Sequence, residues 1–156
     1  MGMTVAELVY MCCFRCPKKK FIEDIIKLEK TMNMPQLAKS IFDHKNKNGI
    51  NCLIVSFNMM RLYENETGNK PDSSVPMFNE IESTVLYLIK LAEDNKLNMD
   101  KILNWMAENG MNLFYGAALY SESLALELLR RNVDVKTVDN LFRTPPFRVS
   151  FIFFGF

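Results

Sequence analysis

Residues 110–147 constrain the fold more than any other part of the chain, because a helix-turn-helix pattern ends there and begins again. Asn112 can accept hydrogen bonds from the free N–H groups of a helical first turn, and Thr144 can do the same further along the chain. Pro145 then occupies the first helical position, where its missing N–H is not needed. Two helix starts with the same capping chemistry predict a repeating unit of two helices and a loop.

The apolar positions of this stretch predict how its helices pack. Leu124 and Leu128 lie four residues apart with Leu129 beside them, which makes one apolar helical face. We therefore expect these three leucines to be buried between neighbouring helices. The small side chains of Ala117 and Ala118 should let the first helix approach a neighbour closely.

The same stretch resembles an ankyrin repeat, a family whose unit of roughly 33 residues holds a turn and two antiparallel helices. The resemblance covers 110–147, where Asn132 falls at the site that usually holds glycine just past the second helix. That site commonly needs a left-handed backbone, for which asparagine is the usual second choice. The resemblance implies an all-α fold, a short solenoid of stacked antiparallel helix pairs with an atypical C-terminal end. It also implies a protein that binds another protein and is not an enzyme.

A weaker copy of the pattern covers about 48–94. Gly49 and Asn51 stand there in the same relation as Gly110 and Asn112 do later in the chain. The distance in sequence from Asn51 to Asn112 corresponds to one repeat plus an insertion. The copy therefore predicts a second helix-pair unit that carries extra chain.

The insertion is the segment 64–77, which is rich in Gly, Pro, Asn, Asp and Ser and has no apolar period. This composition is typical of a loop. Apolar stripes at helical spacing flank it on both sides. The predicted helices of this region run from Asn51 to Tyr63, from Phe78 to Glu93 and from Met99 to Glu108.

We divide the chain into an N-terminal segment (1–17), a helical repeat domain (18–147) and an apolar tail (148–156). Within the domain, 18–43 is either an N-terminal cap or a degenerate first repeat. The tail abandons the helical pattern, so it either folds back as a makeshift cap or marks a cut within a longer array. Because a low-charge apolar run favours aggregation, deleting the tail should preserve or improve solubility.

The composition excludes several classes of partner. The chain has 156 residues, 49% hydrophobic content and a formal net charge of +1. A near-neutral balance does not support general nucleic-acid binding, which needs a basic face. The segment 1–14 lacks the positive start of an export signal, and no apolar run approaches the roughly 18 residues of a membrane span. We therefore expect a cytoplasmic or nuclear protein.

Three cysteines near the N-terminus, Cys12, Cys13 and Cys16, allow more than one interpretation. Together with His44 and Cys52 they could in principle hold zinc, but structural zinc sites usually present two tight pairs, so we expect no metal. Adjacent cysteines beside a lysine run are also typical of an S-acylated segment at an anionic membrane. A membrane-tethered adaptor is therefore the alternative to a plain interaction module. Inert thiols beside a solvated lysine run remain the simplest interpretation.

No catalytic constellation is visible. His44 is the only histidine and lies in a polar loop, which leaves little material for acid–base chemistry near neutral pH. The chain has no Gly-rich phosphate loop and no nucleophile elbow. We expect no cofactor and no small-molecule substrate.

The partner-binding surface is expected at the loop between repeats and the adjoining first helix, as the resemblance implies. In that family, loop tips project from the stack and the inner helices line a concave face. Tyr120 is a candidate aromatic anchor, since tyrosine is enriched in binding hot spots. The insertion 64–77 is the next candidate surface. The loop residues expected to face the partner are Lys136, Val138, Asn140 and Leu141.

Overall fold

The computed structural model describes residues 3–15, 17–32 and 36–135. These residues form helices and connecting loops without any strand, which confirms the predicted all-α class. The tail and most of the predicted partner-binding loop lie outside the described residues. The helices are α1 (Val5–Arg15), α2 (Lys19–Met32), α3 (Leu37–Asp43), α4 (Cys52–Val55), α5 (Asn58–Thr67), α6 (Pro76–Asp94), α7 (Met99–Leu103), α8 (Leu113–Tyr120) and α9 (Glu122–Arg130).

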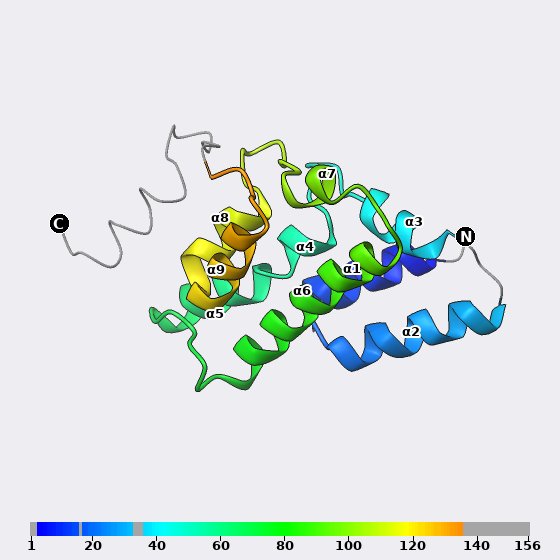
Figure 1. Ribbon diagram of the computed structural model, residues 1–156. Helices are drawn as coiled ribbons and strands as arrows, with labels where there is room; N and C mark the ends of the chain where they lie inside the picture. The colour runs from blue at the N-terminus through cyan, green and yellow to red at the C-terminus, as the bar shows by residue number, and fades with distance from the viewer. Residues whose placement is uncertain (1–2, 16, 33–35, 136–156) are drawn as a thin grey trace.

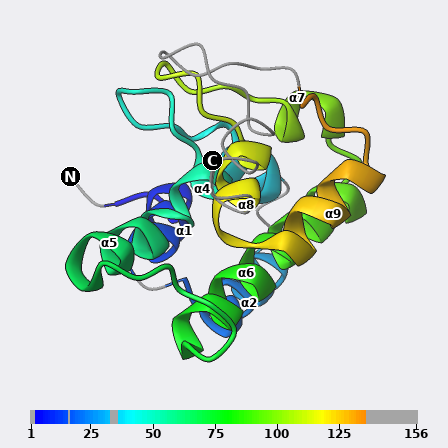
Figure 2. The same cartoon turned by 90° about the vertical axis from the view of Figure 1, so that its left-hand side faces the viewer.

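Helices α1, α2, α4, α6, α8 and α9 lie in two rows (Figure 1). One row contains α1, α4 and α8, and α4 contacts both of the others. The other row contains α2, α6 and α9, seen side by side along one edge of the molecule in Figure 2. Consecutive helices of the chain thus pair across the rows, α1 with α2 and α8 with α9.

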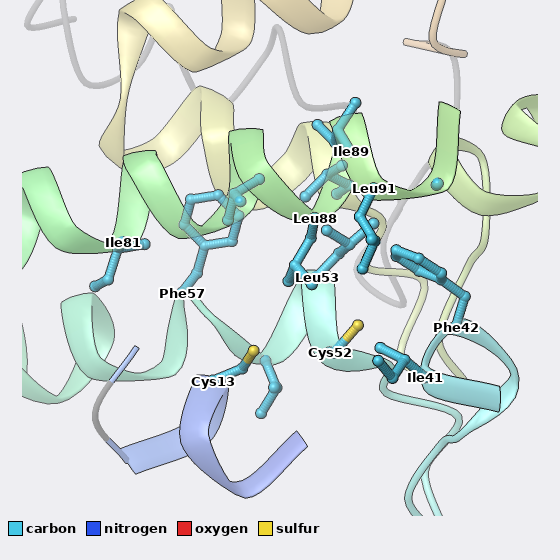
Figure 3. Packing of buried hydrophobic residues seen from close by; sticks show 14 of the residues in the cluster. Cys13, Ile41, Phe42, Cys52, Leu53, Phe57, Ile81, Leu88, Ile89 and Leu91 are labelled. Carbon is cyan, nitrogen blue, oxygen red and sulfur yellow. The ribbon is translucent and has the colours of Figure 1, made fainter. Parts of the chain in front are cut away.

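The hydrophobic core fills the space between the rows, and α1 is part of it. Val9 and Cys13 of α1 are fully buried, as are Ile22 of α2 and Leu88 of α6. Figure 3 shows side chains of α1, α3, α4 and α6 meeting in this core. The N-terminal segment therefore packs together with the helices of the repeat-like region.

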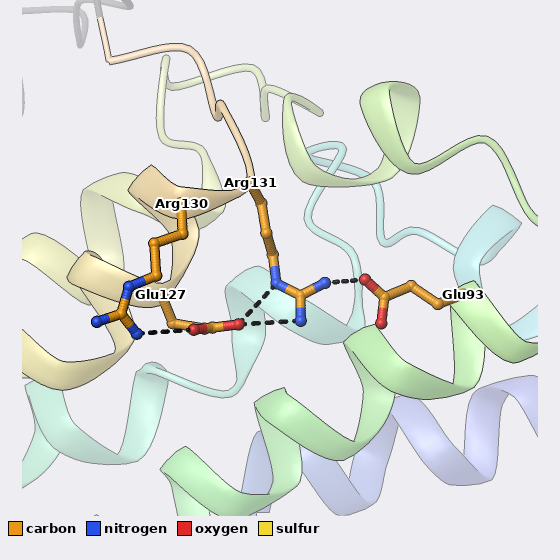
Figure 4. A network of polar contacts seen from close by, with 4 residues as sticks. All are labelled: Glu93, Glu127, Arg130 and Arg131. Carbon is orange, nitrogen blue, oxygen red and sulfur yellow. Dashed lines mark hydrogen bonds and ion pairs between the residues drawn. The ribbon is translucent and has the colours of Figure 1, made fainter.

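An ion-pair network joins the ends of α6 and α9 (Figure 4). The Arg131 guanidinium bridges Glu93 of α6 and Glu127 of α9, with 3.0 Å between its Nη2 and the Glu127 Oε1. Arg130 adds a longer contact of 3.4 Å to Glu127. Because such partly exposed pairs contribute only about 0–1 kcal/mol each, the network orients the two helices more than it stabilises them.

The first predicted helix, from Asn51 to Tyr63, is wrong because the chain bends inside it. α4 ends at Val55, and α5 begins at Asn58 and runs on to Thr67. The Ser56 hydroxyl donates to the Cys52 carbonyl at 2.8 Å, a back-bond that often accompanies a helix bend. The predicted loop 64–77 therefore starts with the last turn of α5, and Gly68 follows this helix in the left-handed region (φ +70°).

The other two predicted helices differ from the structure in their bounds. α6 starts at Pro76 instead of Phe78, since proline fits the first helical turn, and it ends at Asp94. α7 ends at Leu103 instead of Glu108. The Asn104 amide donates to the Asp100 carboxylate at 2.8 Å, and its oxygen accepts from the Asp134 N–H at 2.7 Å. These contacts favour a helix end at this point.

Packing of α8 and α9 confirms most of the prediction for the apolar face. Leu124 and Leu128 are buried at 1% and 0% exposure, and Ala117 and Ala118 are buried as well. The prediction for Leu129 is wrong, because its side chain is 44% exposed. Successive helical residues point about 100° apart, so a residue next to the buried Leu128 turns towards solvent.

Asn112 caps α8 as predicted, and its removal should destabilise the fold. Its side-chain oxygen accepts from the Tyr115 N–H at 2.8 Å, and the residue is fully buried. We expect Asn112→Ala to lower the free energy of unfolding by about 1–2 kcal/mol in urea denaturation. Asn98→Ala, at the exposed cap of α7, is the matched control and should cost less. Equal effects at both sites would contradict a special role for the buried cap.

Candidate functional site

Two loops of the same geometry precede α4 and α8. In the first, the Asn46 N–H donates to the Ile50 carbonyl at 3.1 Å, and Gly49 turns in the left-handed region (φ +70°). In the second, the Ala107 N–H donates to the Met111 carbonyl at 2.9 Å, and Gly110 makes the same turn (φ +78°). The Gly-x-Asn pattern of the sequence therefore encodes a complete hairpin-like loop followed by a capped helix.

The second helix of each pair also ends in the same way. Lys96 after α6 and Asn132 after α9 both adopt the left-handed conformation, with φ of 54° and 56°. The residue after each, Leu97 or Val133, donates from its N–H back into the helix. This is the Schellman ending, in which left-handed backbone satisfies the last helical carbonyls. It confirms the conformation expected for Asn132 and reveals Lys96 as its counterpart.

The two loops contact each other directly. The Glu108 N–H donates to the Asn48 carbonyl at 3.1 Å, which joins the second loop to the first. The indole Nε1 of Trp105 donates to the Gly49 carbonyl at 2.7 Å. The loops thus form one continuous edge of the molecule, with Lys47, Asn48, Glu108 and Asn109 exposed along it.

The helices that follow the loops offer little surface to a partner. Every residue of α4 is buried, and so is α8 from Leu113 to Ala118. A partner that touches this part of the described chain therefore meets the loop edge and the short helices beside it. No concave face is open along α4 and α8.

A pocket opens beside the loop edge, between the short helices α3 and α7. Adding the difference in residue number between Asn51 and Asn112 to the bounds of α3 gives 98–104, which agrees with α7 to within one residue at each end. The two helices therefore hold equivalent places beside their loops. The pocket has a volume of about 130 Å³. Its lining comes from α3, the first loop and the segment around α7, and consists of Lys39, Phe42, Asp43, Lys45, Asn51, Leu97, Asn98, Lys101, Ile102 and Trp105.

Charge in the pocket is predominantly positive. Lys39 pairs with Asp43, and this hydrogen bond is the main reason why the pKa of the Asp43 carboxyl lies below its ordinary value. The ammonium of Lys45 lies 3.1 Å from the centre of the Trp105 ring, a cation–π contact. Partial burial lowers the pKa of Lys45, and the positive charge of Lys101 lowers it further.

These pocket residues were not among the sequence-predicted site residues. A lone tryptophan and three scattered lysines form no recognisable spacing in the sequence. The offset between Asn51 and Asn112 was a usable signal, because applied to 37–43 it places 98–104 at the same position in the next unit. Only the packing of the helices brings the tryptophan and the lysines together around the pocket.

Of the predicted partner-binding residues, Tyr120 lies within the described chain, while Lys136, Val138, Asn140 and Leu141 lie outside it. The Tyr120 hydroxyl donates to the Glu64 carboxylate at 2.9 Å. Lys70 donates to the Leu119 carbonyl at 3.2 Å. The fold therefore brings Tyr120 together with 64–77, the two surfaces that the sequence had offered as alternatives.

The candidate acylation sites differ in their surroundings. Cys13 is fully buried and Cys12 is half-buried, while Cys16 lies outside the described residues. Burial raises the pKa of the Cys13 thiol well above its ordinary value, and it raises that of Cys52 to about 12. Acylation of Cys13 would thus require α1 to leave the core.

Burial of Cys13 and Cys52 predicts protection from alkylation. In a Cys12→Ser/Cys16→Ser variant, only these two thiols remain. Because alkylating reagents attack the accessible thiolate, we expect no modification by iodoacetamide at pH 8 until denaturant unfolds the protein. Mass spectrometry of the intact chain gives the number of modified thiols. Modification of the native protein at the rate of the denatured protein would show that α1 does not stay in the core.

The remaining candidates for chemistry stay apart. His44 packs edge-on against the Tyr10 ring, with 5.2 Å between the ring centres. Within the described ranges, no three His, Cys, Asp or Glu side chains come together in a way that could hold a metal ion. Across the same ranges, no helix is both long enough and apolar enough to cross a bilayer.

No protein-family model matches the chain, and no curated protein is significantly similar to it.

Proposed function

We propose that this protein is a non-catalytic protein–protein interaction module built from helix-pair units of the ankyrin kind. The proposal is supported most by the two loops, which share their turn glycines, backbone bonds and helix caps at one constant offset in sequence. The direct bond between Glu108 and Asn48 adds to this support. Rigid loops that line up at one edge present side chains in a fixed arrangement, which lowers the entropy lost on binding.

The partner surface in this proposal is the loop edge, defined by 46–51 and 107–112, together with α3 and α7. The buried state of α4 and α8 favours this edge over the helix faces. The alternative function, a membrane-tethered adaptor, gains no comparable support, because the Cys13 side chain is enclosed by the core.

Site-specific photocrosslinking in the native source tests the proposal. A photoreactive residue at Asn109, exposed on the loop edge, should capture a distinct protein partner. The same residue at Lys90, exposed on α6 in the other row, is the matched control and should not capture that partner. Capture of one partner from Lys90 but not from Asn109 would place the binding surface on the opposite row and contradict the proposal.

A further inference from the structure

The pocket between α3 and α7 has a definite excess of positive charge. Three lysines, Lys39, Lys45 and Lys101, line it against the single carboxylate of Asp43. Lys39 is paired with Asp43. Neither Lys45 nor Lys101 forms an ion pair with a carboxylate in the part of the chain that the structure describes. Two positive charges are therefore left facing a small cavity.

Side chains of the pocket hold one another in place. Trp105 is half-buried and fixed by its 2.7 Å hydrogen bond to Gly49. Its ring in turn holds the Lys45 ammonium at 3.1 Å. A charged group held in place by a rigid neighbour loses less side-chain entropy on binding than a freely moving lysine does.

Lys45 lies in surroundings that disfavour its positive charge. Burial and the nearby Lys101 both lower the pKa of Lys45, so its charged form is disfavoured there. An anion between the two lysines would reverse this effect, because an opposite charge within a few ångströms favours the ammonium form. The acidic group that lines the pocket is Asp43 from α3, which pairs with Lys39 and whose charge offsets part of the lowering of the Lys45 pKa.

We propose that this pocket binds an acidic side chain of a protein partner, with Lys45 and Lys101 contacting its anionic group and Trp105 covering it. The inference rests on the proposed function, and it names the chemistry of the partner segment. A cavity of about 130 Å³ has room for one carboxylate or phosphoryl group, so aspartate, glutamate and phosphorylated residues share this chemistry. A nucleic acid fits less well, because its binding needs a basic stripe and the chain's net charge is only +1.

Trp105 provides the readout, because it is the only tryptophan of the chain. Its fluorescence in the full-length protein is followed during titration with three short peptides that differ at one residue, glutamate, phosphoserine or glutamine. The acidic peptides should give a saturable change and the glutamine peptide none. Comparison of the first two peptides shows whether a carboxylate or a phosphoryl group is preferred.

Lysine variants test whether the peptides bind in the pocket. Lys45→Gln/Lys101→Gln should weaken binding of the acidic peptides about tenfold, since hydrogen bonds to charged groups are lost. Lys18→Gln/Lys90→Gln removes the same charge from exposed sites outside the pocket and should bind as the native chain does.

Three results would overturn the inference. They are equal binding by both double variants, the same fluorescence change with sodium chloride at matched ionic strength, and tighter saturation by a single-stranded oligonucleotide at the same lysines. None of these results alters the photocrosslinking outcome at Asn109, so the pocket and the proposed function can fail separately.

Discussion

Replacing Leu128 by alanine should lower the free energy of unfolding by about 2–5 kcal/mol. Leu128 is fully buried in α9 and belongs to the hydrophobic core that joins the helices. Truncation removes its apolar contacts and leaves a cavity that the surrounding helices fill only in part. Urea denaturation followed by far-UV circular dichroism measures the change.

Leu129→Ala is the matched control, since it is the same substitution one residue later at a side chain that is 44% exposed. Surface substitutions usually change stability by less than about 0.5 kcal/mol, and we expect a value near that limit. If both variants lose the same stability, the buried face of α9 is not the one that the structure shows.

Replacing Gly116 by alanine should destabilise the protein by about 1–3 kcal/mol. A Cβ atom at this position would lie 2.5 Å from Cδ2 and 2.8 Å from Cγ of the Phe57 ring. Phe57 is 4% exposed at the bend between α4 and α5, so its ring cannot move aside without disturbing the core. At an exposed position inside a helix, replacing glycine by alanine would stabilise the protein by about 1 kcal/mol. The sign of the measured change therefore shows whether α8 lies against Phe57.

A double-mutant cycle separates the overlap from other effects of the substitution. In a Phe57→Leu background the smaller side chain leaves room, and Gly116→Ala should cost less than it does in the native chain. We expect a coupling energy of about 0.5–3 kcal/mol, as for residues in contact. Additive losses, or a stabilised Gly116→Ala variant, would show that α8 does not approach Phe57 closely.

Local signals in the sequence predicted individual helix ends well. The caps at Asn51 and Asn112 and the left-handed residue at Asn132 are all present. Each depends on a side chain or a backbone preference that acts within a single helical turn. Lys96 was missed because lysine has no preference for the left-handed region, and the preceding helix end imposes that conformation on it.

Predictions that depended on the neighbourhood of a residue were less successful. The pattern placed Leu129 on the buried face, but α9 turns that position outward. The mostly apolar segment after Asn51 gave no sign of the bend at Ser56 and Phe57. At this bend Phe57 packs against Gly116 of α8, a contact between residues far apart in the sequence.

The amino-acid sequence by itself determined the all-α class, the repeated loop and cap, and the offset between the two copies, because hydrophobic period, capping and turn residues act through nearby atoms. Only the tertiary structure decided which surface is available. Packing of the helices buries α4 and α8, brings Tyr120 to Glu64, and gathers Lys45, Lys101 and Trp105 around one pocket. Those contacts join residues that lie far apart in the sequence, and their distances depend on how whole helices pack.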